Sequence, residues 1–551
     1  MKFQTPVMRG PSNAPLALVF LCMVVSVAGY LQALDYPFVN DDKFYVVENA
    51  KLARLQLAEL WRLFVEPYNP YEFLPLRDLS YWFDISLFGL TPYAFRAHNI
   101  ILYLLCLPLV FVTTMGIWRY FRSFDVASAP WVAAAVTALF VVNPSHVEPV
   151  VWISGRKDLL STVFSLLALW FAMKTRKEHG LSKNYAMAAL LALLAAMFSK
   201  ATAVAVAPII ALLWVFFWRD IPVQSRRRTE LLWPLSSVLL AGCIALVFSS
   251  YSAAKAPAYF GIEVITRALS VLGWLVRLAV SPENRNFIYP VFDDPYLPLM
   301  VALGVAIMVT AAASVVVVLR KRSLEGFALI AFALLCMPYI QLIPYKTHSL
   351  VSDRFLTLAV WPVAVLIVAL SWRLERIARA VLIFVVAISW SFQTIERPRD
   401  WQSYEALWKS DFRAYPEHYL PAYEVITMYQ LTKGNFHEAG AVADGIGKSE
   451  ARRVMNKLVE VAKDLNDASS TGDPRLAMAH LQDLEQILNF PPAQIKWDPT
   501  LHYFWMESFG SFILQWQELV KRFPDYPQVR YNARLSLRSA LRFGSADAPS
   551  P

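Results

Sequence analysis

Long apolar runs separated by short polar segments dominate the first four hundred residues of the chain. Runs of roughly 17 to 25 residues, each able to cross about 30 Å of hydrocarbon as a helix, recur from Leu16 to Gln393 and then stop. This pattern predicts about eleven transmembrane helices, near residues 16–34, 97–118, 130–143, 159–173, 185–199, 202–218, 231–250, 296–319, 326–343, 355–372 and 378–393. The first run has a long apolar core and leads into further spans, so we interpret it as a retained helix, not a signal peptide.

One further apolar stretch, residues 262–281, is predicted not to cross. A crossing there would place the cluster Arg320 to Arg322 on the outer side of the membrane. Arg267 and Arg277 interrupt the stretch, as is typical of an amphipathic helix at the interface. We therefore expect residues 262–281 to lie against the outer face or to be re-entrant.

Basic clusters between the runs predict the orientation of the chain. Loops rich in lysine and arginine stay in the cytoplasm, so the N-terminus faces inward and the segment after the last span faces outward. The clusters are Arg119 and Arg122; Lys174, Arg176, Lys177 and Lys183; Arg219 and Arg226 to Arg228; Arg320 to Arg322; and Arg373, Arg376 and Arg379. Because the basic residues lie between spans and not in one patch, the net charge of +9 does not indicate nucleic acid.

Residues 396–551 read as a soluble helical domain on the outer side. Residues 434–439 match the turn and second helix of a tetratricopeptide-type hairpin, and residues 518–534 look like a second, degenerate unit. Residues 466–474 are polar and predict a turn that joins helices. The sequence thus predicts a transmembrane domain over 1–395, whose first outer loop (35–96) carries interfacial helices, and a tetratricopeptide-like domain over 396–551.

Composition supports this class: of 551 residues, 57% are hydrophobic and only 17% charged, which is outside the range of ordinary soluble domains. All four cysteines lie in apolar runs, so no disulfide framework or cysteine metal site is indicated. No glycine-rich phosphate loop is present in the sequence, which argues against a nucleotide-driven pump.

Two adjacent carboxylates, Asp41 and Asp42, follow the first span at its outer end. Neighbouring carboxylates raise one another's pKa, which suits a group that accepts a proton during a reaction. The alternative is that the pair only ends a helix and hydrates the boundary, and the two interpretations are equally favoured by these residues alone.

Cations at the outer face favour the catalytic interpretation. Arg156 and Lys157 lie on the wrong side by the positive-inside rule, and Lys200 and Arg354 join them from two other outer loops. Several cations that converge from separate loops predict a site for a lipid phosphate or diphosphate. For Arg156 and Lys157 the alternative is pairing with Asp158 or Glu148, and for Lys200 and Arg354 it is snorkelling of the side chain at the interface.

Other outer residues give weaker signals. His146 could bind a metal or donate to a substrate, but no second histidine or cysteine stands at ligand spacing, so no metal site is predicted. Glu72 and Arg77, on either side of Pro75, are interpreted as mostly structural.

With these motifs in hand, the sequence resembles the GT-C glycosyltransferases that use polyprenyl-phosphate-linked sugars, and most closely the bacterial relatives of the transmembrane and tetratricopeptide-repeat O-mannosyltransferases. The resemblance covers nearly the whole chain, and its most specific stretch is 146–160. It also rests on residues 40–42, 75–76, 87–90, 92–99, 353–356 and 401–439. The chain departs from the family pattern at Leu74, where a basic residue is usual, and at Arg96, where a histidine is usual.

The resemblance implies an inverting hexosyl- or pentosyltransferase. In that reaction Asp41 deprotonates the acceptor hydroxyl and Asp42 positions the acceptor or Asp41. The resemblance assigns the donor phosphate and the other substrate groups to two further sets of residues. Arg156, Lys157, Lys200 and Arg354 bind the phosphate, and His146, Glu148, Arg77 and Arg96 contact substrate.

The implied partners are a polyprenyl-phosphate sugar and a hydroxyl acceptor on a protein or cell-surface glycan, with a further protein partner for the helical domain. No cofactor is required, although a divalent metal at the aspartates is compatible. The short chain and compact loops favour a bacterial inner membrane, with residues 396–551 in the periplasm. The alternative functions are a lipid or solute transporter or flippase with a docking domain, and a membrane-anchored scaffold. Few ionisable residues fall in the middle of spans, which disfavours transport.

Overall fold

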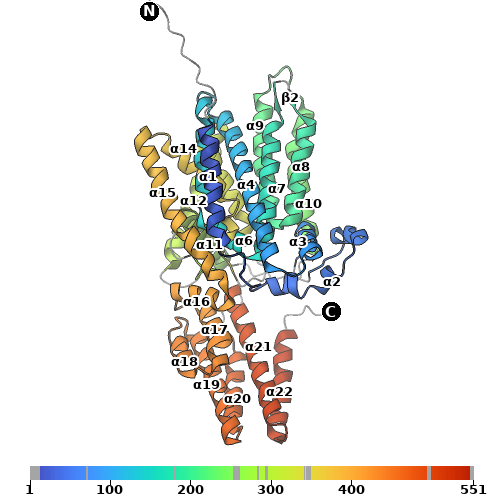
Figure 1. Ribbon diagram of the computed structural model, residues 1–551, viewed down its shortest axis with the longest axis vertical. Coiled ribbons are helices and arrows are strands. Elements are labelled where there is room, and N and C mark those ends of the chain that lie inside the picture. The colour runs from blue at the N-terminus through green and yellow to red at the C-terminus, as the bar shows by residue number, and fades with distance from the viewer. Residues whose placement is uncertain are drawn as a thin grey trace, which may run out of the picture.

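The computed structural model of the chain is built almost wholly from helices, as the hydrophobic pattern predicts. It describes residues 13–69, 72–178, 180–251, 261–281, 285–291, 296–340, 342, 349–492 and 498–545. Within these ranges the strands are β1 (Arg176–Lys177) and β2 (Gly180–Leu181), paired as a small antiparallel hairpin. Figure 1 shows a bundle of long helices and, at one end of it, a second group of helices from the C-terminal part of the chain.

Each of the eleven predicted spans falls on a helix of the bundle. These helices are α1 (Ala14–Leu31), α4 (Pro92–Phe121), α5 (Ala129–Val141), α7 (Arg156–Lys174), α8 (Lys183–Ser199), α9 (Val206–Asp220), α10 (Leu232–Tyr251), α12 (Tyr296–Lys321), α13 (Leu324–Cys336), α14 (Val360–Ser371) and α15 (Arg376–Glu396). Among the described residues, six helical segments are long and apolar enough to cross a membrane, or seven if α5 and the bent segment after it form one span. The polytopic all-α class is thereby confirmed, and the count of eleven stays a prediction.

Helix α11 (Ile262–Val280) is not one of the six segments suited to crossing. It packs on α12 so closely that a Cβ atom at Gly273 would lie 1.8 Å from the Met300 carbonyl oxygen, and one at Gly304 would lie 2.1 Å from that of Leu269. Only glycine permits this contact between two helix backbones. Glycine therefore fixes α11 beside α12, and its non-crossing position at the outer face stays a prediction.

The two ends of the bundle carry different chemistry. At one end lie three of the predicted cytoplasmic clusters, from which Arg122 and Arg373 pair with Glu325 and Arg322 pairs with Asp220. At the other end lie the segments around residues 35–91, 143–158 and 349–357, next to the C-terminal helices (Figure 1). The basic clusters and the candidate site thus occupy opposite ends, as an N-terminus-in, C-terminus-out topology predicts.

The first outer loop folds into short helices that present apolar side chains. These are η1 (Lys43–Val47), α2 (Ala50–Ala53), η2 (Leu57–Phe64) and α3 (Pro75–Phe88). Leu57 and Trp61 on η2 are more than half exposed, which suits a segment lying at a membrane interface. Helix α4 begins at Pro92, since proline is favoured in the first turn of a helix, and the bounds 35–96 of the outer loop stay a prediction.

Short helical turns connect the long elements of the bundle. They are η3 (Val126–Ser128), η4 (Pro144–His146), α6 (Val147–Val151), η5 (Ile153–Gly155), η6 (Ala201–Ala205), η7 (Arg228–Leu231), η8 (Met337–Tyr339), η9 (Asp353–Leu356) and η10 (Arg397–Gln402). Three of them, η4, α6 and η9, carry the candidate site residues His146, Glu148 and Arg354.

The C-terminal part is a series of helices, as expected for a tetratricopeptide-like region. Its elements are α16 (Tyr404–Ala414), α17 (Tyr419–Val425), η11 (Ile426–Gln430), η12 (Leu431–Lys433), α18 (Phe436–Asp444), α19 (Ser449–Thr471), α20 (Arg475–Leu488), α21 (Pro499–Arg522) and α22 (Pro527–Ser545). Turns occur at Gly434 and between α21 and α22, where the sequence predicts them. The predicted turn over 466–474 is mostly wrong, because α19 continues to Thr471 and buries Leu465 and Ala468. The division of the chain near residue 395 stays a prediction.

A buried carboxylate joins this helical group to the bundle. Asp411 on α16 is almost fully buried and accepts hydrogen bonds from the backbone N–H groups of Phe287 (2.9 and 3.1 Å) and Ile288 (2.8 Å). Burial raises the pKa of Asp411 to about 8, although the two N–H donors oppose the shift. The first C-terminal helix is therefore hydrogen-bonded directly to a loop of the bundle.

Candidate active site

The two adjacent aspartates have opposite environments. Asn40 has a φ of 52°, a left-handed conformation that asparagine tolerates better than most residues. Asp42 is fully buried, and its carboxylate accepts hydrogen bonds from Val39 N (3.1 Å), Ser154 N (2.8 Å) and Ser154 Oγ (2.6 Å). Asp41 is half-buried, and its carboxylate makes no hydrogen bond or ion pair with any residue in the described ranges. Asp41 is thus available to a substrate, whereas Asp42 anchors the loop.

The pKa of Asp42 agrees with this division between an available Asp41 and an anchoring Asp42. Burial raises the pKa of Asp42 to about 6, and the bonds from Ser154 and Val39 limit the rise. Above that pH the ionised Asp42 is stabilised by the three hydrogen bonds. It therefore holds the 39–42 segment against η5 when the site is at neutral pH.

Glycine shapes the loop that receives Asp42. A Cβ atom at Gly155 would lie 2.6 Å from Pro149 Cα, so no other residue fits between α6 and the start of α7. This close approach places Ser154 toward the aspartates and starts α7 at Arg156. The stretch 146–160, the most specific part of the resemblance, owes its shape to this contact.

The side chain of Arg156 lies in the protein interior, bound to other groups of the protein. Its side chain is fully buried and bonds to Asn99 Oδ1 (2.8 Å), the Phe95 carbonyl (2.8 Å) and Asp84 (2.5 Å). The guanidinium also lies 4.9 Å from the Tyr81 ring centroid. Its donors are used inside the protein, and neither Arg156 nor any of these partners lines the cavity that holds Lys200 and Arg354.

The side chain of Arg96 is likewise bound to other groups of the protein. It donates to the carbonyls of Val151 (2.9 Å), Pro37 (2.5 Å) and Tyr36. These bonds fasten the segment before the aspartates to the end of α6. A histidine at this position would have too few donors to make the same three bonds. The structure gives Arg96 a role in positioning and no contact with the cavity.

Lys157 and Arg77 share one carboxylate, Glu72. The Lys157 ammonium lies 2.7 and 2.9 Å from its two oxygens, and Arg77 Nη1 lies 2.5 Å from one of them. Burial raises the pKa of Glu72, but the two cations lower it more, to about 2. Glu72 and Arg77 were expected to be mostly structural, and Glu72 proves to be the partner of a predicted phosphate-binding lysine.

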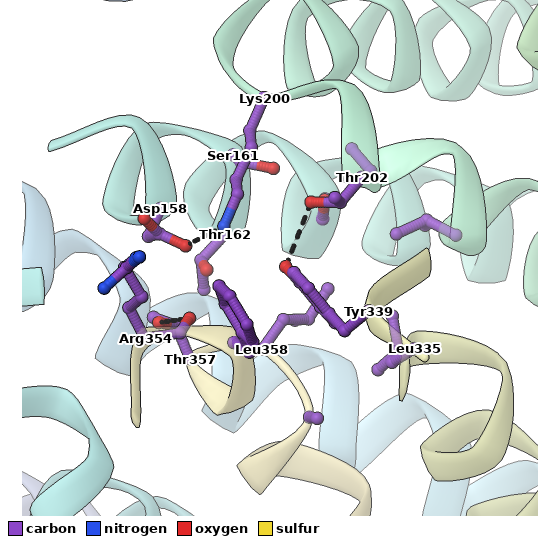
Figure 2. Close-up of a pocket in the computed structure, with 15 residues that line it drawn as sticks. Asp158, Ser161, Thr162, Lys200, Thr202, Leu335, Tyr339, Arg354, Thr357 and Leu358 are labelled. Atoms are coloured by element: carbon purple, nitrogen blue, oxygen red, sulfur yellow. Dashed lines mark hydrogen bonds and ion pairs between the residues drawn. The ribbon is translucent and has the colours of Figure 1, made fainter. Parts of the chain in front are cut away.

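Lys200 and Arg354 lie together at a small cavity (Figure 2). Lys200 pairs with Asp158 and Arg354 pairs with Glu148, and each cation keeps further N–H donors beyond these pairs. The cavity measures about 30 Å³, enough for a water molecule but not for a sugar. Figure 2 shows both cations close to Asp158, with Tyr339 facing them.

The carboxylate of Asp41 belongs to the same electrostatic neighbourhood. Burial lowers the pKa of Arg354, but the carboxylates of Glu148, Asp158 and Asp41 raise it more, so its net shift is upward. Lys200 behaves in the same way beside Asp158. The structure therefore brings Lys200 and Arg354 together at one cavity, and the charge of the Asp41 carboxylate acts on Arg354.

His146 lies in the core, outside this neighbourhood. It is fully buried, with Nε2 3.0 Å from the Thr357 carbonyl oxygen and Nδ1 3.3 Å from the Tyr103 hydroxyl. Its position fixes η4 against the segment after η9 and does not offer the ring to a substrate. Among the described residues, no group of three or more histidine, cysteine, aspartate or glutamate side chains could hold a metal ion.

Sequence reasoning missed the group that supports Arg354. The neighbouring Asp353 is fully buried and accepts from Tyr289 Oη (2.7 Å) and Arg285 Nη1 (3.1 Å), while Arg397 Nη2 lies 3.2 Å away. Asp353 lies in the stretch 353–356 on which the resemblance rests, but nothing in a single sequence indicates that two distant arginines meet there. Nothing in the sequence indicates that Asp84 pairs with Arg156 either.

Comparison with known proteins points to one group. "Protein O-mannosyl-transferase F38B6.6" of Caenorhabditis elegans is 26% identical over 181 residues, 32% of this chain and 25% of that protein. "Protein O-mannosyl-transferase Tmtc1" of Drosophila melanogaster is 29% identical over 215 residues, 36% of this chain and 24% of that protein. "Protein O-mannosyl-transferase TMTC1" of Homo sapiens is 29% identical over 170 residues, 29% of this chain and 18% of that protein.

The similarity is therefore partial on both sides, since the chain spans a quarter or less of the length of these relatives. No protein-family model matches the chain, and no solved structure gives a significant match. The apolar helices and the relatives together support an integral membrane protein. Over about a third of its length, the chain is a homologue of the transmembrane and tetratricopeptide-repeat protein O-mannosyltransferases, which are enzymes of the GT-C fold, as its motifs predicted.

Proposed function

We propose that the protein is a membrane glycosyltransferase that moves a sugar from a polyprenyl-phosphate donor to a hydroxyl group of a protein at the outer membrane face. The observation that carries this proposal is the carboxylate of Asp41, which has no partner in the described residues and lies in the field of Arg354. A base beside cations is the arrangement that transfer from a phosphate requires.

The proposed reaction is a single displacement. Asp41 takes the proton of the acceptor hydroxyl while the hydroxyl oxygen forms a bond to the anomeric carbon. The bond from that carbon to the phosphate oxygen breaks, and its electrons leave with the lipid phosphate. One displacement inverts the configuration of the sugar. A positioned base contributes about 10²- to 10⁴-fold to the rate of such a step.

Lys200 and Arg354 are the groups we assign to the leaving phosphate, with Lys157 next to them. Each is paired with a carboxylate and less than about an eighth of its side chain is exposed, so each is held in place before a donor binds. Their remaining N–H donors can bind phosphate oxygens and neutralise the charge that develops there. The proposal requires no metal ion, because the side chains supply the positive charge.

Donor binding requires movement at the cavity, since its present volume does not hold a sugar. The ring of Tyr339 stacks on Phe355 with centroids 4.2 Å apart, and the Tyr339 hydroxyl lies 3.0 Å from Thr202 Oγ1. We propose that these two rings separate, or shift together, when the sugar phosphate enters between Lys200 and Arg354.

The acceptor side faces the C-terminal helices in this proposal. Burial and the carboxylates of Glu507, Glu424 and Asp41 raise the pKa of the Tyr503 phenol on α21, so the charge of the proposed base acts on a group of this helix. The relatives are named as enzymes that act on proteins, and helical-repeat surfaces suit extended peptides. Deletion of residues beyond about 400 should therefore impair acceptor choice more than lipid binding.

The compartment is also part of the proposal. The compact loops between the spans suit a bacterial inner membrane with the C-terminal helices in the periplasm, although the relatives compared above are eukaryotic. An endoplasmic reticulum membrane would present the same outer face to the lumen.

The experiment that tests this function is transfer by the purified full-length protein in vesicles. A panel of radiolabelled polyprenyl-phosphate hexoses and pentoses is offered with a serine- and threonine-containing peptide, and the anomeric configuration of the product is determined. Transfer from one donor with inversion supports the proposal. Retention would contradict the single displacement, and donor flipping without transfer from any donor would favour a lipid transporter instead.

A further inference from the structure

A second cavity lies at the opposite end of the bundle from the candidate site. It measures about 790 Å³ and is bounded by the last turns of α4 and α7, the β1–β2 hairpin and the end of α9. Helix α7 carries Arg156 to Asp158 in its first turn and Lys174 in its last, and its 19 residues span about 28 Å. This cavity is therefore separate from the proposed active site, and nothing in the proposed reaction uses it.

Positive charge surrounds the cavity. Arg119, Lys174, Arg176 and Lys177 line it, and three of them, all but Arg176, make no ion pair with a carboxylate in the described part of the chain. The lining also contains two carboxylates, of Glu178 and Asp220. Four cations face two carboxylates, so an anionic group would meet a net positive surface.

One of those carboxylates is already neutralised from outside the cavity. Asp220 pairs with Arg322 at the end of α12, lies 3.8 Å from Arg176, and accepts a hydrogen bond from the Tyr120 hydroxyl (2.9 Å). Its charge is thus shared with a cation that does not line the cavity. The net charge around the cavity is therefore more positive than the count of charged lining residues indicates.

The wall below these cations is apolar and aromatic. Val112, Met115 and Gly116 of α4 face Met173 of α7, and the Trp170 ring lies 5.7 Å from the Lys174 ammonium. Cations above an apolar wall, with an aromatic ring between them, match the order of phosphate, glycerol and acyl chain in a phospholipid. A free phosphate ion would use the cations but would gain nothing from the apolar wall.

We propose that this cavity is a binding site for the headgroup of an anionic phospholipid, on the face of the membrane opposite the candidate active site. The phosphate is bound by Arg119, Lys174 and Lys177, and the first carbons of an acyl chain lie along Met115 and Met173. A lipid bound there connects α4 to α7, the helix whose other end carries Lys157 and Asp158. The inference does not depend on the proposed enzymatic function.

The test uses the full-length protein in detergent and measures retained lipids by native mass spectrometry and protection against heat. The probes are phosphatidylglycerol, phosphatidylcholine and inorganic phosphate. The variant Arg119→Ala/Lys174→Ala/Lys177→Ala removes three cavity cations. The matched control, Arg320→Ala/Lys321→Ala/Arg376→Ala, removes three exposed cations that do not line the cavity. The charge-preserving variant Arg119→Lys/Lys174→Arg/Lys177→Arg checks that loss of binding follows charge.

We expect the wild-type protein to prefer phosphatidylglycerol to phosphatidylcholine, and the cavity variant to bind phosphatidylglycerol at least tenfold more weakly, since each basic residue near a lipid phosphate contributes about 1 kcal/mol. The control and the charge-preserving variant should keep the preference. An unchanged preference in the cavity variant, or an equal loss in the control, would overturn the proposal. Equal protection by inorganic phosphate would assign the cavity to a free anion and would also overturn it. If the cavity variant does not fold, Lys177→Ala alone, which alters an exposed hairpin residue, must still weaken phosphatidylglycerol binding.

Discussion

Replacement of Ser154 by alanine tests the anchoring of Asp42. The change removes the Ser154 hydroxyl, which lies 2.6 Å from Asp42 Oδ1, and keeps the two backbone donors at 2.8 and 3.1 Å. Loss of a hydrogen bond to an ionised group costs about 1.5–3 kcal/mol, whereas loss of one between neutral groups costs about 0.5–1.5 kcal/mol. The difference between the two costs, about 1–1.5 kcal/mol, corresponds to about one pKa unit. We therefore expect Ser154→Ala to raise the pKa of Asp42 from about 6 to about 7.

The pH dependence of stability follows from this shift. The pKa of Asp42 in the folded protein lies above its ordinary value of 3.8, so between these two pH values the folded state holds more protons than the unfolded state. The free energy of unfolding consequently falls as pH rises from about 4 to about 6 and then levels off. In Ser154→Ala the fall continues to about pH 7. The stability gap between wild type and variant should therefore widen between about pH 5 and pH 8.

The assay is thermal unfolding of the full-length protein in detergent at both pH values. Ser165→Ala is the matched control, because Ser165 is equally buried and its hydroxyl has no hydrogen-bond partner among the described residues. The control should show a small loss of Tm that is the same at both pH values. An equal loss of Tm at pH 5 and pH 8 for Ser154→Ala would refute the reasoning, since it would mean that the serine does not bind an ionising Asp42.

Three further changes separate substrate binding from structural support. Lys200→Met should weaken donor binding about 10- to 100-fold, because a charge-assisted bond to phosphate is lost; a titration that gives an unchanged donor Kd would contradict the assignment. Arg156→Met should lower stability by about 3–5 kcal/mol, because it takes the arginine from the buried Asp84 and leaves it only the contact with His98, and it should reduce the yield of folded protein; normal yield with impaired donor binding would instead restore Arg156 to the phosphate site. Glu72→Gln should remove a loss of stability on acidification: the lowered pKa of Glu72 stabilises the wild-type protein above about pH 4.5, and this contribution is lost as pH falls toward about 2. Acid-unfolding curves with the same shape for both proteins would argue against the pair of Glu72 with Lys157 and Arg77.

The hydrophobic pattern predicts where the helices of this protein lie, but it does not predict which residues pair with its charged side chains. All eleven apolar runs are helices because hydrocarbon length and helix rise act on consecutive residues. Charge pairing acts between residues far apart in the chain: Lys157 meets Glu72 across 85 positions, and Arg354 meets Glu148 across 206. No local sequence pattern shows which residues so far apart will pair. The sequence therefore does not predict which of the four candidate phosphate-binding cations line the cavity and which are bound within the protein interior.

The candidate base illustrates the same limit at the smallest scale. The sequence predicts that Asp41 and Asp42 both lie at the outer membrane boundary. Only the resemblance assigns them different roles, because nothing in the residues themselves distinguishes the two. The division arises from Ser154, 112 positions away from Asp42, which the close contact of Gly155 with Pro149 brings to the second aspartate. The turn expected over 466–474 was misjudged for a related reason, because burial of Leu465 and Ala468 outweighs the polar residues around them.

The most direct test of the central claim compares sugar transfer and donor binding in Asp41→Asn with those in Asp35→Asn. Asp35 is an exposed carboxylate of the same outer loop and serves as the matched control. The account predicts that Asp41→Asn transfers sugar about 10²- to 10⁴-fold more slowly while it binds the polyprenyl-phosphate sugar as tightly as the wild type, and that Asp35→Asn behaves like the wild type. Normal transfer by Asp41→Asn would contradict the account, because the only aspartate of the pair with a free carboxylate among the described residues would then not be the base.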